Sequence, residues 1–270
     1  MKDVHSPLTA SLRLAGVVLW ILLLLPALLL FRLLGLPHAV ILVGQVIYRG
    51  LVRIIGFRVE TLGTICARRP VLYVANHCSY FDIIVLGSQL QASFIAKKEV
   101  ASWPGVGPIA RLAGTVFVER RARQSRTQRD EISARLERQR NSLILFPEGT
   151  SSNGQSVLPF KSALFSVAEA TGDNLPVQPI SVAYTRLDGM PLGRFWRSHY
   201  AWYGDMDLAS HLWLALGLGR ATVTVVYHPP VTLQQWGSRK ALAEYCEQQV
   251  RKGVIAANGG RSEICSPTVA

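Results

Sequence analysis

The chain has few cysteines, and none of them are closely paired. Its 270 residues include four cysteines, at positions 66, 78, 246 and 265, without a C-x-x-C pair. This spacing provides neither the ligand cluster of a structural zinc site nor the framework of a disulfide-rich secreted domain. We therefore expect no bound metal and a reducing compartment.

Acidic residues are also scarce. The chain has 17 Asp and Glu against 29 Lys and Arg, a net charge of +12. Such a surplus favours an anionic partner, such as nucleic acid, an acidic membrane or a phosphorylated substrate. The most charged stretch, residues 119–140, contains no aromatic residue, whereas single-stranded nucleic acids are bound by aromatics set among basic residues. We interpret this stretch as a surface helix and expect no nucleic-acid partner.

Several common catalytic motifs are missing as well. The sequence contains neither the G-x-S-x-G elbow of serine hydrolases nor the H-E-x-x-H helix of zinc proteases. Residues 103–108, WPGVGP, imitate part of a dinucleotide-binding loop. Pro108 and the lack of a strand directly before them argue against that function, and we expect an ordinary loop there.

Apolar residues, in contrast, are abundant. They make up 49% of the chain, and the mean hydropathy is +0.24. Residues 14–31 form an uncharged run of about the minimum length for a transmembrane helix. A second apolar segment covers residues 38–57, after Gly35-Leu36-Pro37. Its polar residues Gln45, Arg49 and Arg53 recur every four positions, and we expect this stripe to face lipid headgroups.

Three arrangements of the N-terminal region are open. A signal peptide is disfavoured by the length of the run and the lack of an A-x-A cleavage site. The others are a single span followed by an interfacial helix, and a hairpin that enters one leaflet and returns. Arginines flank both apolar segments, which favours a hairpin with both flanks in the cytoplasm, although Arg32 near its tip must then snorkel. We expect a cytoplasmic-membrane protein with its catalytic domain on the cytoplasmic side.

Beyond these helices the pattern predicts an α/β domain. Short apolar runs indicate strands at 57–62, 71–75, 93–96, 114–118, 143–146, 177–184 and 222–228, and helices at 161–170, 208–218 and 240–253. Pro179 suggests an edge or a bulge in its strand, and we expect the aromatic-rich residues 195–203 in the core. The expected division is membrane helices at 1–57, a catalytic domain at 58–255 and a polar tail at 256–270.

The chemistry centres on residues 71–82, VLYVANHCSYFD. The apolar run reads as a buried strand that ends at Asn76-His77, and Asp82 opens an apolar helical segment. If the helix starts irregularly, the Asp82 carboxylate can reach the His77 ring. A carboxylate on one imidazole nitrogen fixes the tautomer and makes the other nitrogen a better base. Pairs with this spacing also occur by chance, so the pair alone does not establish catalysis.

Three further segments strengthen the interpretation. The chain carries N-H-x4-D at 76–82, G-x-x-F-V-x-R at 114–120, F-P-E-G-T at 146–150 and V-x-P-I at 177–180. In this order and spacing the segments resemble the glycerolipid acyltransferase family, which acylates 1-acylglycerol-3-phosphate and related lysolipids. The resemblance covers about residues 70–185. It implies a mixed, largely parallel sheet flanked by helices, preceded by a membrane-embedded helical pair.

The resemblance also implies a reaction. An acyl group would pass from a thioester, acyl-CoA or acyl-carrier protein, to a lysolipid hydroxyl in the bilayer, with no cofactor. His77 would act as general base and Asp82 would orient it. Backbone N–H groups at the start of the following helix are candidates to stabilise the oxyanion. We do not expect Cys78 to be a nucleophile, because adjacent side chains leaving a strand tend to point apart.

The remaining motif residues would hold the acceptor. In the family, the Glu-Gly-Thr segment contributes to acceptor binding, which corresponds here to Glu148, Gly149 and Thr150. Arg120 is a candidate for the anionic headgroup, and Lys97 or Lys98 would add a second cation.

The identity of the acceptor is open. Our leading expectation is 1-acylglycerol-3-phosphate, giving phosphatidic acid. Phosphate-acceptor members commonly continue E-G-T-R, whereas position 151 here is Ser. The segment from 146 looks like the bacterial branch that includes lyso-ornithine lipid acyltransferases, so lyso-ornithine lipid is the alternative. A thioesterase and a non-catalytic, basic membrane-surface protein are further alternatives, and the intact His77/Asp82 pair argues against the latter.

Overall fold

The centre of the protein is a mixed β-sheet. The computed structural model describes residues 5–103, 106–118, 136, 141–170 and 174–261. Within them the sheet has eight strands, in the order β1-β8-β6-β2-β5-β3-β4, with β7 paired to β6. The strands are β1 Phe57–Leu62, β2 Leu72–Ala75, β3 Ala92–Lys97, β4 Val116–Val118, β5 Ser142–Leu145, β6 Val177–Leu187, β7 Met190–Pro191 and β8 Ala221–Tyr227.

Most neighbouring strands run parallel. This holds for β1 with β8, for β2 with β5 and β6, and for β3 with β4 and β5, whereas β6 is antiparallel to β8 and β7. The predicted mixed, largely parallel sheet is therefore confirmed. Because β2, β3 and β5 are parallel, their carboxyl ends lie at one edge of the sheet, where α/β folds commonly bind ligands. The loops after β2 and β5, which carry the two main motifs, meet there.

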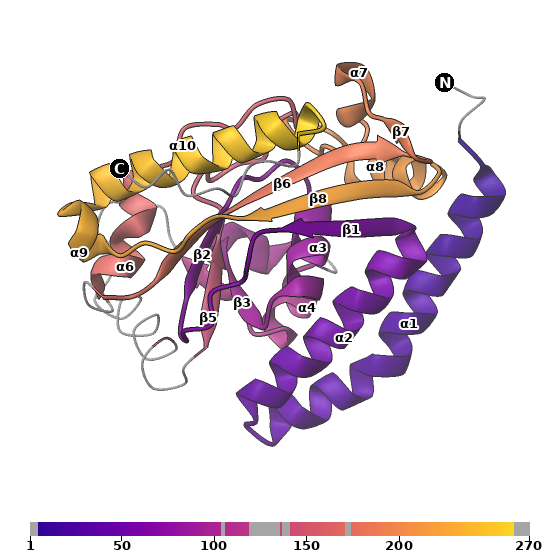
Figure 1. Ribbon diagram of the computed structural model, residues 1–270. Helices are drawn as coiled ribbons and strands as arrows, with labels where there is room; N and C mark the ends of the chain where they lie inside the picture. Colours follow the sequence, from indigo (N-terminus) through magenta and orange to yellow (C-terminus); the bar gives the residue numbers. More distant parts are fainter. Residues whose placement is uncertain (1–4, 104–105, 119–135, 137–140, 171–173, 262–270) are drawn as a thin grey trace.

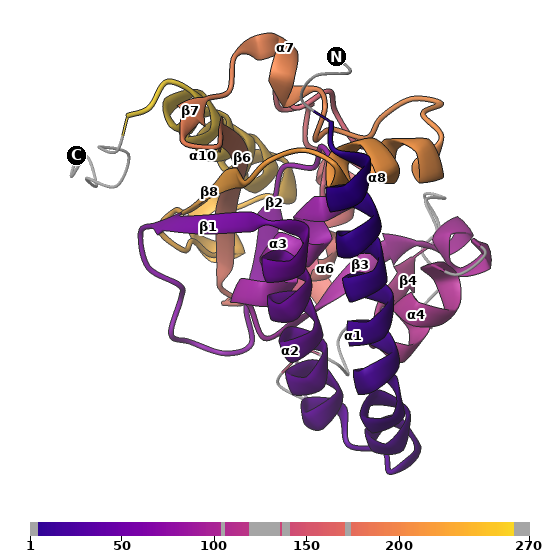
Figure 2. The same cartoon turned by 90° about the vertical axis from the view of Figure 1, so that its right-hand side faces the viewer.

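Helices cover both faces of the sheet (Figures 1 and 2). One core cluster joins α1, α2, α3 and α8 to the sheet, and the other joins α10 and the η3–α6 segment to the opposite face. The helices are α1 Pro7–Leu33, α2 Pro37–Ile55, α3 Phe81–Gln89, η1 Lys98–Ser102, α4 Val106–Leu112, η3 Ser162–Phe165, α6 Ser166–Ala170, α7 Arg194–Arg197, α8 Leu208–Leu216, α9 Leu233–Trp236 and α10 Arg239–Asn258.

The first two helices form the predicted pair. By length and composition both are apolar enough to cross a membrane. They lie side by side and antiparallel (Figure 2), so both flanks of the pair lie at the same end, as the hairpin prediction requires. The Trp20 ring lies against Gly50, and the Tyr48 ring against Gly87 of α3, with no room for a Cβ at either glycine. The pair is thus packed onto the α/β domain along α2.

The polar stripe of α2 is only partly exposed. Gln45 is buried, and the Arg49 Nε donates to the Ser88 carbonyl near the end of α3. The prediction that Gln45 faces lipid headgroups is wrong, because Gln45 is buried against the end of α3, whose last carbonyls need donors. Arg49 is exposed, and its orientation toward headgroups stays a prediction. Arg53, one turn further, is exposed. Near the tip, Arg32 lines a small cavity with Ser93 and Asn141 of the domain.

Some predicted element boundaries need correction. Residues 103–108 are not all loop, because α4 begins at Val106. The helix expected at 161–170 divides into η3 and α6. The last helix runs to Asn258, so the tail expected from residue 256 begins inside it. Phe195 is 64% exposed and Tyr200 is 1% exposed, so the aromatic-rich segment lies only partly in the core.

Pro179 does not mark an edge strand. It lies in β6, between β2 and β8 in the sheet order. Proline lacks the backbone N–H that a central strand normally pairs. It is tolerated here because β8 ends at Tyr227, which pairs with Ile180, so Pro179 has no paired residue in β8. The Pro179 carbonyl accepts the N–H of His228, just beyond that end, at 3.0 Å. The bulge in β6 lies instead between Tyr184 and Arg186. Except for the buried Leu136, the surface helix expected at 119–140 lies in the part of the chain that is not described. The three-part domain division stays a prediction.

Candidate active site

The two residues of the first motif are in contact. The His77 Nδ1 lies 3.0 Å from the Asp82 Oδ2, as predicted. The loop between them starts at Asn76, whose amide exchanges two hydrogen bonds of 2.9 and 2.8 Å with the backbone of Val182. This contact fixes the end of β2 against β6, and the irregular turn before α3 brings the carboxylate back to the ring.

Asp82 is fully buried and accepts several hydrogen bonds. Besides His77, the Oδ2 atom accepts the backbone N–H groups of Cys78 at 2.7 Å and Ser79 at 2.8 Å. The Oδ1 atom accepts the Tyr184 hydroxyl at 2.9 Å. An ionised carboxylate only accepts, so in the neutral imidazole the His77 Nδ1 carries the hydrogen and Nε2 has the free lone pair. The N–H groups of Cys78 and Ser79 are therefore bonded to Asp82.

The His77 ring is held flat and stays partly accessible. It stacks on Phe146, directly after β5, with ring centres 4.1 Å apart and an interplanar angle of 18°. The imidazole side chain is 20% exposed. A ring with a fixed plane, a fixed tautomer and an accessible edge can exchange a proton with a bound ligand.

Glu148 connects the second motif to the first. One carboxylate oxygen accepts the His77 backbone N–H at 2.9 Å, and the other accepts the N–H of Leu158 at 3.2 Å. The residue is 1% exposed, and burial raises the pKa of its carboxyl group to about 8. These contacts support a role in positioning the His77 loop, and the acceptor-binding role implied by the resemblance stays a prediction.

The other predicted site residues are less closely joined. Gly149 has φ +68°, which a non-glycine residue rarely adopts, and closes the turn after Phe146. Thr150 follows it and is exposed. Lys97 ends β3 at the same edge of the sheet as the two motifs. Arg120 lies outside the described residues. The structure thus joins His77, Asp82 and Glu148 by hydrogen bonds, and the roles of the other residues stay predictions.

The sequence did not point to Tyr184. This residue follows the V-x-P-I segment on the same face of β6 as Ile180 and Val182, all three in one core cluster. The period-two alternation of a strand signals this face, but no motif residue marks the tyrosine. Its contact with Asp82 depends on the pairing of β6 beside β2.

Cys78 lies beside His77 but is not suited to attack a thioester. It is 2% exposed, and its Sγ is 3.7 Å from the Asp82 Oδ1. Burial, and then the negative charge of Asp82, raise the pKa of this thiol well above its usual range. The thiolate is the nucleophilic form of cysteine, so the structure supports the prediction that Cys78 is not the nucleophile.

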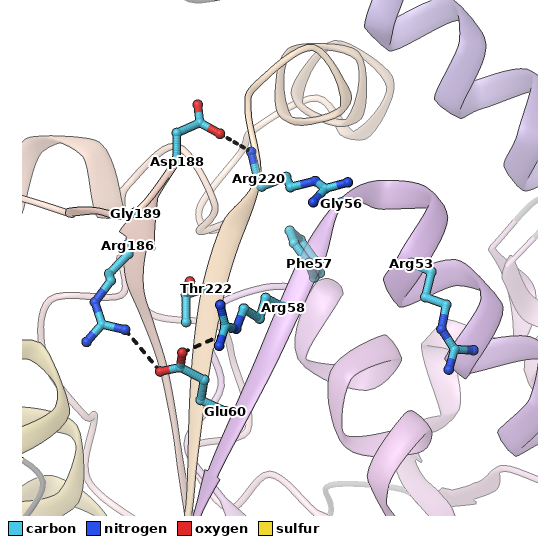
Figure 3. A pocket seen from close by; sticks show the side chains of 10 residues that line it. All are labelled: Arg53, Gly56, Phe57, Arg58, Glu60, Arg186, Asp188, Gly189, Arg220 and Thr222. Atoms are coloured by element: carbon cyan, nitrogen blue, oxygen red, sulfur yellow. Dashed lines mark hydrogen bonds and ion pairs between the residues drawn. The ribbon is translucent and has the colours of Figure 1, made fainter.

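A larger cavity lies elsewhere. It has a volume of about 760 Å³ and is located where the end of α2 meets β1, β8 and the end of β6 (Figure 3). Glu60 there pairs with Arg58 at 3.4 Å and with Arg186 at 3.0 Å, and Asp188 accepts the Arg220 backbone N–H at 2.7 Å. Neither His77 nor Asp82 lines this cavity, so the chemistry is better assigned to the motif-bearing edge.

Comparisons with known proteins identify the family of this chain. A family model described as Acyltransferase matches residues 56–183. Lyso-ornithine lipid O-acyltransferase from Brucella abortus is 44% identical over 221 residues, 79% of this chain and 82% of the relative. The 1-acyl-sn-glycerol-3-phosphate acyltransferase of Neisseria meningitidis is 30% identical over 181 residues, 67% of this chain and 68% of the relative.

A solved structure shows the same architecture. The crystal structure of the 1-acyl-sn-glycerophosphate acyltransferase PlsC from Thermotoga maritima matches with a TM-score of 0.67 at 25% identity, covering 94% of this chain and 97% of that one. The lipid-modifying relatives and the two apolar helices together support membrane association. The family model and the relatives show that the chain belongs to the acyltransferase family and is an acyltransferase.

Proposed function

We propose that this enzyme transfers a fatty acyl group from a thioester donor to the free hydroxyl of lyso-ornithine lipid. The contact between His77 and the buried Asp82, at 3.0 Å, carries the chemistry. The acceptor is supported by the relative that is 44% identical. It is also supported by Ser151, which stands where phosphate-acceptor members commonly have an arginine.

The reaction follows from the fixed tautomer. Asp82 holds the His77 Nδ1–H, and Nε2 removes the proton of the acceptor hydroxyl as its oxygen attacks the thioester carbonyl. The new C–O bond forms as the C–S bond breaks, and the leaving thiolate takes up the proton from the imidazolium. The products are an ester and a free thiol, so no covalent acyl-enzyme is needed.

The remaining motif residues position His77 or bind the acceptor. Glu148 holds the His77 loop through the His77 backbone N–H. Gly149 and Thr150, in the exposed turn that follows, would contact the acceptor backbone, and Arg120 with Lys97 would contact its carboxylate. Acyl-CoA and acyl-carrier protein are both acidic donors that suit the net charge of +12.

A second candidate acceptor is 1-acylglycerol-3-phosphate, with phosphatidic acid as product. It is favoured by the Neisseria relative and by the Thermotoga structure, both named for this activity. With either acceptor, we place the enzyme at the cytoplasmic membrane with the motif-bearing edge on the cytoplasmic side, where acyl-CoA and acyl-carrier protein are available.

The decisive experiment is an acyl-transfer assay on the full-length protein in detergent. Labelled acyl-CoA and acyl-carrier protein are each supplied with lyso-ornithine lipid, with 1-acylglycerol-3-phosphate, or without acceptor. His77→Ala is compared with His199→Ala, a half-buried histidine outside the motifs. We expect product from lyso-ornithine lipid that His77→Ala abolishes and His199→Ala retains. Product from the phosphate acceptor alone would select the second candidate, and fatty acid release without acceptor would indicate a thioesterase.

A further inference from the structure

The two oxygens of the Asp82 carboxylate have different partners. Oδ2 accepts from the His77 ring and from the backbone N–H groups of Cys78 and Ser79, all from the same loop. Oδ1 accepts the hydroxyl of Tyr184 at 2.9 Å, from a residue 102 positions away on β6. The tyrosine hydroxyl thus holds the oxygen that the loop does not, and it limits rotation of the carboxylate about the Cβ–Cγ bond.

The Tyr184 hydroxyl is suited to act as a permanent donor. The residue is 3% exposed, and burial, followed by the negative charge of Asp82, raises the pKa of the phenol well above its usual range. The proton therefore stays on the oxygen across the range in which histidine titrates. A hydrogen bond from a neutral hydroxyl to a carboxylate is charge-assisted and shorter and stronger than one between neutral groups.

Tyr184 is itself held rigidly. Its ring stacks on Tyr200, with centres 5.4 Å apart and an interplanar angle of 2°, and meets the edge of Phe57 at 6.0 Å. Two residues earlier on β6, Val182 makes the two hydrogen bonds to Asn76 that fix the start of the catalytic loop. One strand therefore positions both ends of the segment between Asn76 and Asp82.

We propose that Tyr184 is a positioning residue for the His77–Asp82 pair, an inference that rests on the proposed function. By holding Oδ1, Tyr184 keeps Oδ2 aimed at the His77 Nδ1. By donating a hydrogen bond to the carboxylate, it also reduces the negative charge that Asp82 offers to the imidazolium. Both effects act on the base without any contact between Tyr184 and substrate.

Other titratable groups surround this trio and stay unchanged in the test. Cys78 lies 3.7 Å from the Oδ1 atom, and Glu148 holds the His77 backbone. Tyr80 packs beside Phe81 and bonds to His211, which brings α8 near the loop. The charges of Arg13 and Asp188 act on the Tyr200 hydroxyl. Because these groups are the same in wild type and variants, a difference in pH dependence between the variants reports the loss of the Tyr184 hydroxyl.

Tyr184→Phe and Tyr200→Phe form a matched pair. Both rings are buried in one stack, but the Tyr200 hydroxyl has no hydrogen-bond partner among the described residues. Each variant loses one phenolic oxygen, and only Tyr184→Phe releases Asp82. The protonation of His77 is followed by carbethoxylation, because diethylpyrocarbonate reacts with the neutral imidazole. The reaction is run from pH 5 to 8 and quantified on the His77 peptide by mass spectrometry. Acyl transfer is measured over the same pH range.

In Tyr184→Phe, the midpoint of His77 carbethoxylation is expected to move to higher pH by about 0.5 to 1, because the freed carboxylate stabilises the imidazolium more strongly. We expect kcat to fall about tenfold, since the base is less well oriented, while KM changes less than about twofold because Tyr184 does not touch substrate. Tyr200→Phe should match the wild type in the carbethoxylation midpoint, kcat and KM.

The inference fails if Tyr184→Phe has the same carbethoxylation midpoint and kcat as Tyr200→Phe. If wild-type protein shows no His77-dependent acyl transfer, the proposed function fails, but carbethoxylation still decides the role of Tyr184. Should Tyr184→Phe not fold, 3-fluorotyrosine at position 184 keeps the ring and provides a more acidic donor. The midpoint must then move to lower pH, and an unchanged midpoint contradicts the inference.

Discussion

The Nε of Arg49 on α2 donates a hydrogen bond of 3.1 Å to the carbonyl of Ser88 on α3. Gln45, one turn earlier on α2, reaches the same oxygen at 3.5 Å. The opposite end of α3 carries Asp82 in its first turn. A donor from the N-terminal helical pair thus holds one end of the helix whose other end carries the carboxylate that we propose orients His77.

Loss of the contact between Arg49 and Ser88 should lower the free energy of unfolding measurably. Arg49→Ala removes the donor to Ser88, and hydrogen bonds from charged groups contribute about 1.5–3 kcal/mol. Because Arg49 is exposed, we expect a loss of about 1 kcal/mol and a fall of about 2–4 °C in the melting temperature in detergent. Arg53→Ala, one turn further along α2 and also exposed, should leave the melting temperature within about 1 °C. Equal losses in both variants would show that Arg49 acts through general charge.

Asp82→Asn tests the fixed tautomer. An amide at position 82 offers a donor where the His77 Nδ1–H needs an acceptor, so the imidazole loses the orientation that leaves Nε2 free. In a serine protease triad the corresponding change lowers kcat about 10⁴-fold, and we expect a fall of at least about 10²-fold here. The control is Asp207→Asn, an exposed N-cap on α8, which should retain kcat. Activity above about a tenth of wild type in Asp82→Asn would remove Asp82 from the mechanism.

The contact between His77 and Asp82 could be predicted because it is local. His77 follows the end of a strand and Asp82 lies at the start of the next helix, so the short loop between them brings the two side chains together. Parallel strands bring the second motif to the same edge of the sheet. Tyr184 could not be predicted in this way, because its contact depends on β6 lying beside β2, which the sequence between them does not reveal.

The polar stripe on α2 shows a second limit of prediction from the sequence. The spacing of Gln45 and Arg49 correctly places them on one helical face, but helical period does not indicate what covers that face. In the folded chain α3 lies against this face, and both Gln45 and Arg49 donate to the carbonyl of Ser88. Polar spacing on an apolar helix therefore predicts a shared face, and tertiary packing decides the partner.

Glu148 should make stability depend on pH. Burial raises the pKa of its carboxyl group from 4.5 to about 8, so the folded state keeps a proton that the unfolded chain has lost. The contribution to the free energy of unfolding is therefore full below about pH 4.5 and is lost as pH rises through about 8. We expect the melting temperature to fall between pH 5 and 8, and to fall less in Glu148→Gln. Glu244→Gln, on the exposed side of α10, should follow the wild type; if Glu148→Gln does too, the buried carboxyl group does not bind that proton.

Ser151→Arg should change the choice between acceptors. An arginine at this position would restore the E-G-T-R segment of phosphate-acceptor members and add a charge-assisted contact to phosphate. We expect the ratio of kcat/KM for 1-acylglycerol-3-phosphate over lyso-ornithine lipid to rise about tenfold or more. Ser156→Arg adds the same charge at an exposed position in the same loop and should not change the ratio. A similar ratio change in both variants would indicate a general effect of charge on anionic lipid.

The membrane-facing surface can be located with tryptophan. The outward side of α1 exposes a row of leucines, including Leu8, Leu12 and Leu19, each at least 66% exposed. Helix α8 lies beside the start of α1 (Figure 2), where the Arg13 guanidinium donates to the Leu216 carbonyl at 3.0 Å. Trp213 on α8 is 37% exposed, and its ring centre lies 6.0 Å from that of His5, just before α1. The apolar side of α8 thus continues the leucine surface, and we expect Trp213 to contact acyl chains.

Trp236 on α9 provides the matched control, because it is also 37% exposed but lies at the other end of the molecule (Figure 1). The six tryptophans of the chain emit together in vesicles that contain brominated lipid, which quenches those in contact with the acyl region. Trp213→Phe should lower the quenched fraction, because it removes a quenched emitter. Trp236→Phe should raise it, because it removes an unquenched one. If Trp213→Phe instead raised the quenched fraction, as Trp236→Phe does, Trp213 would not contact the acyl region, and the leucine surface of α1 would contact lipid without α8.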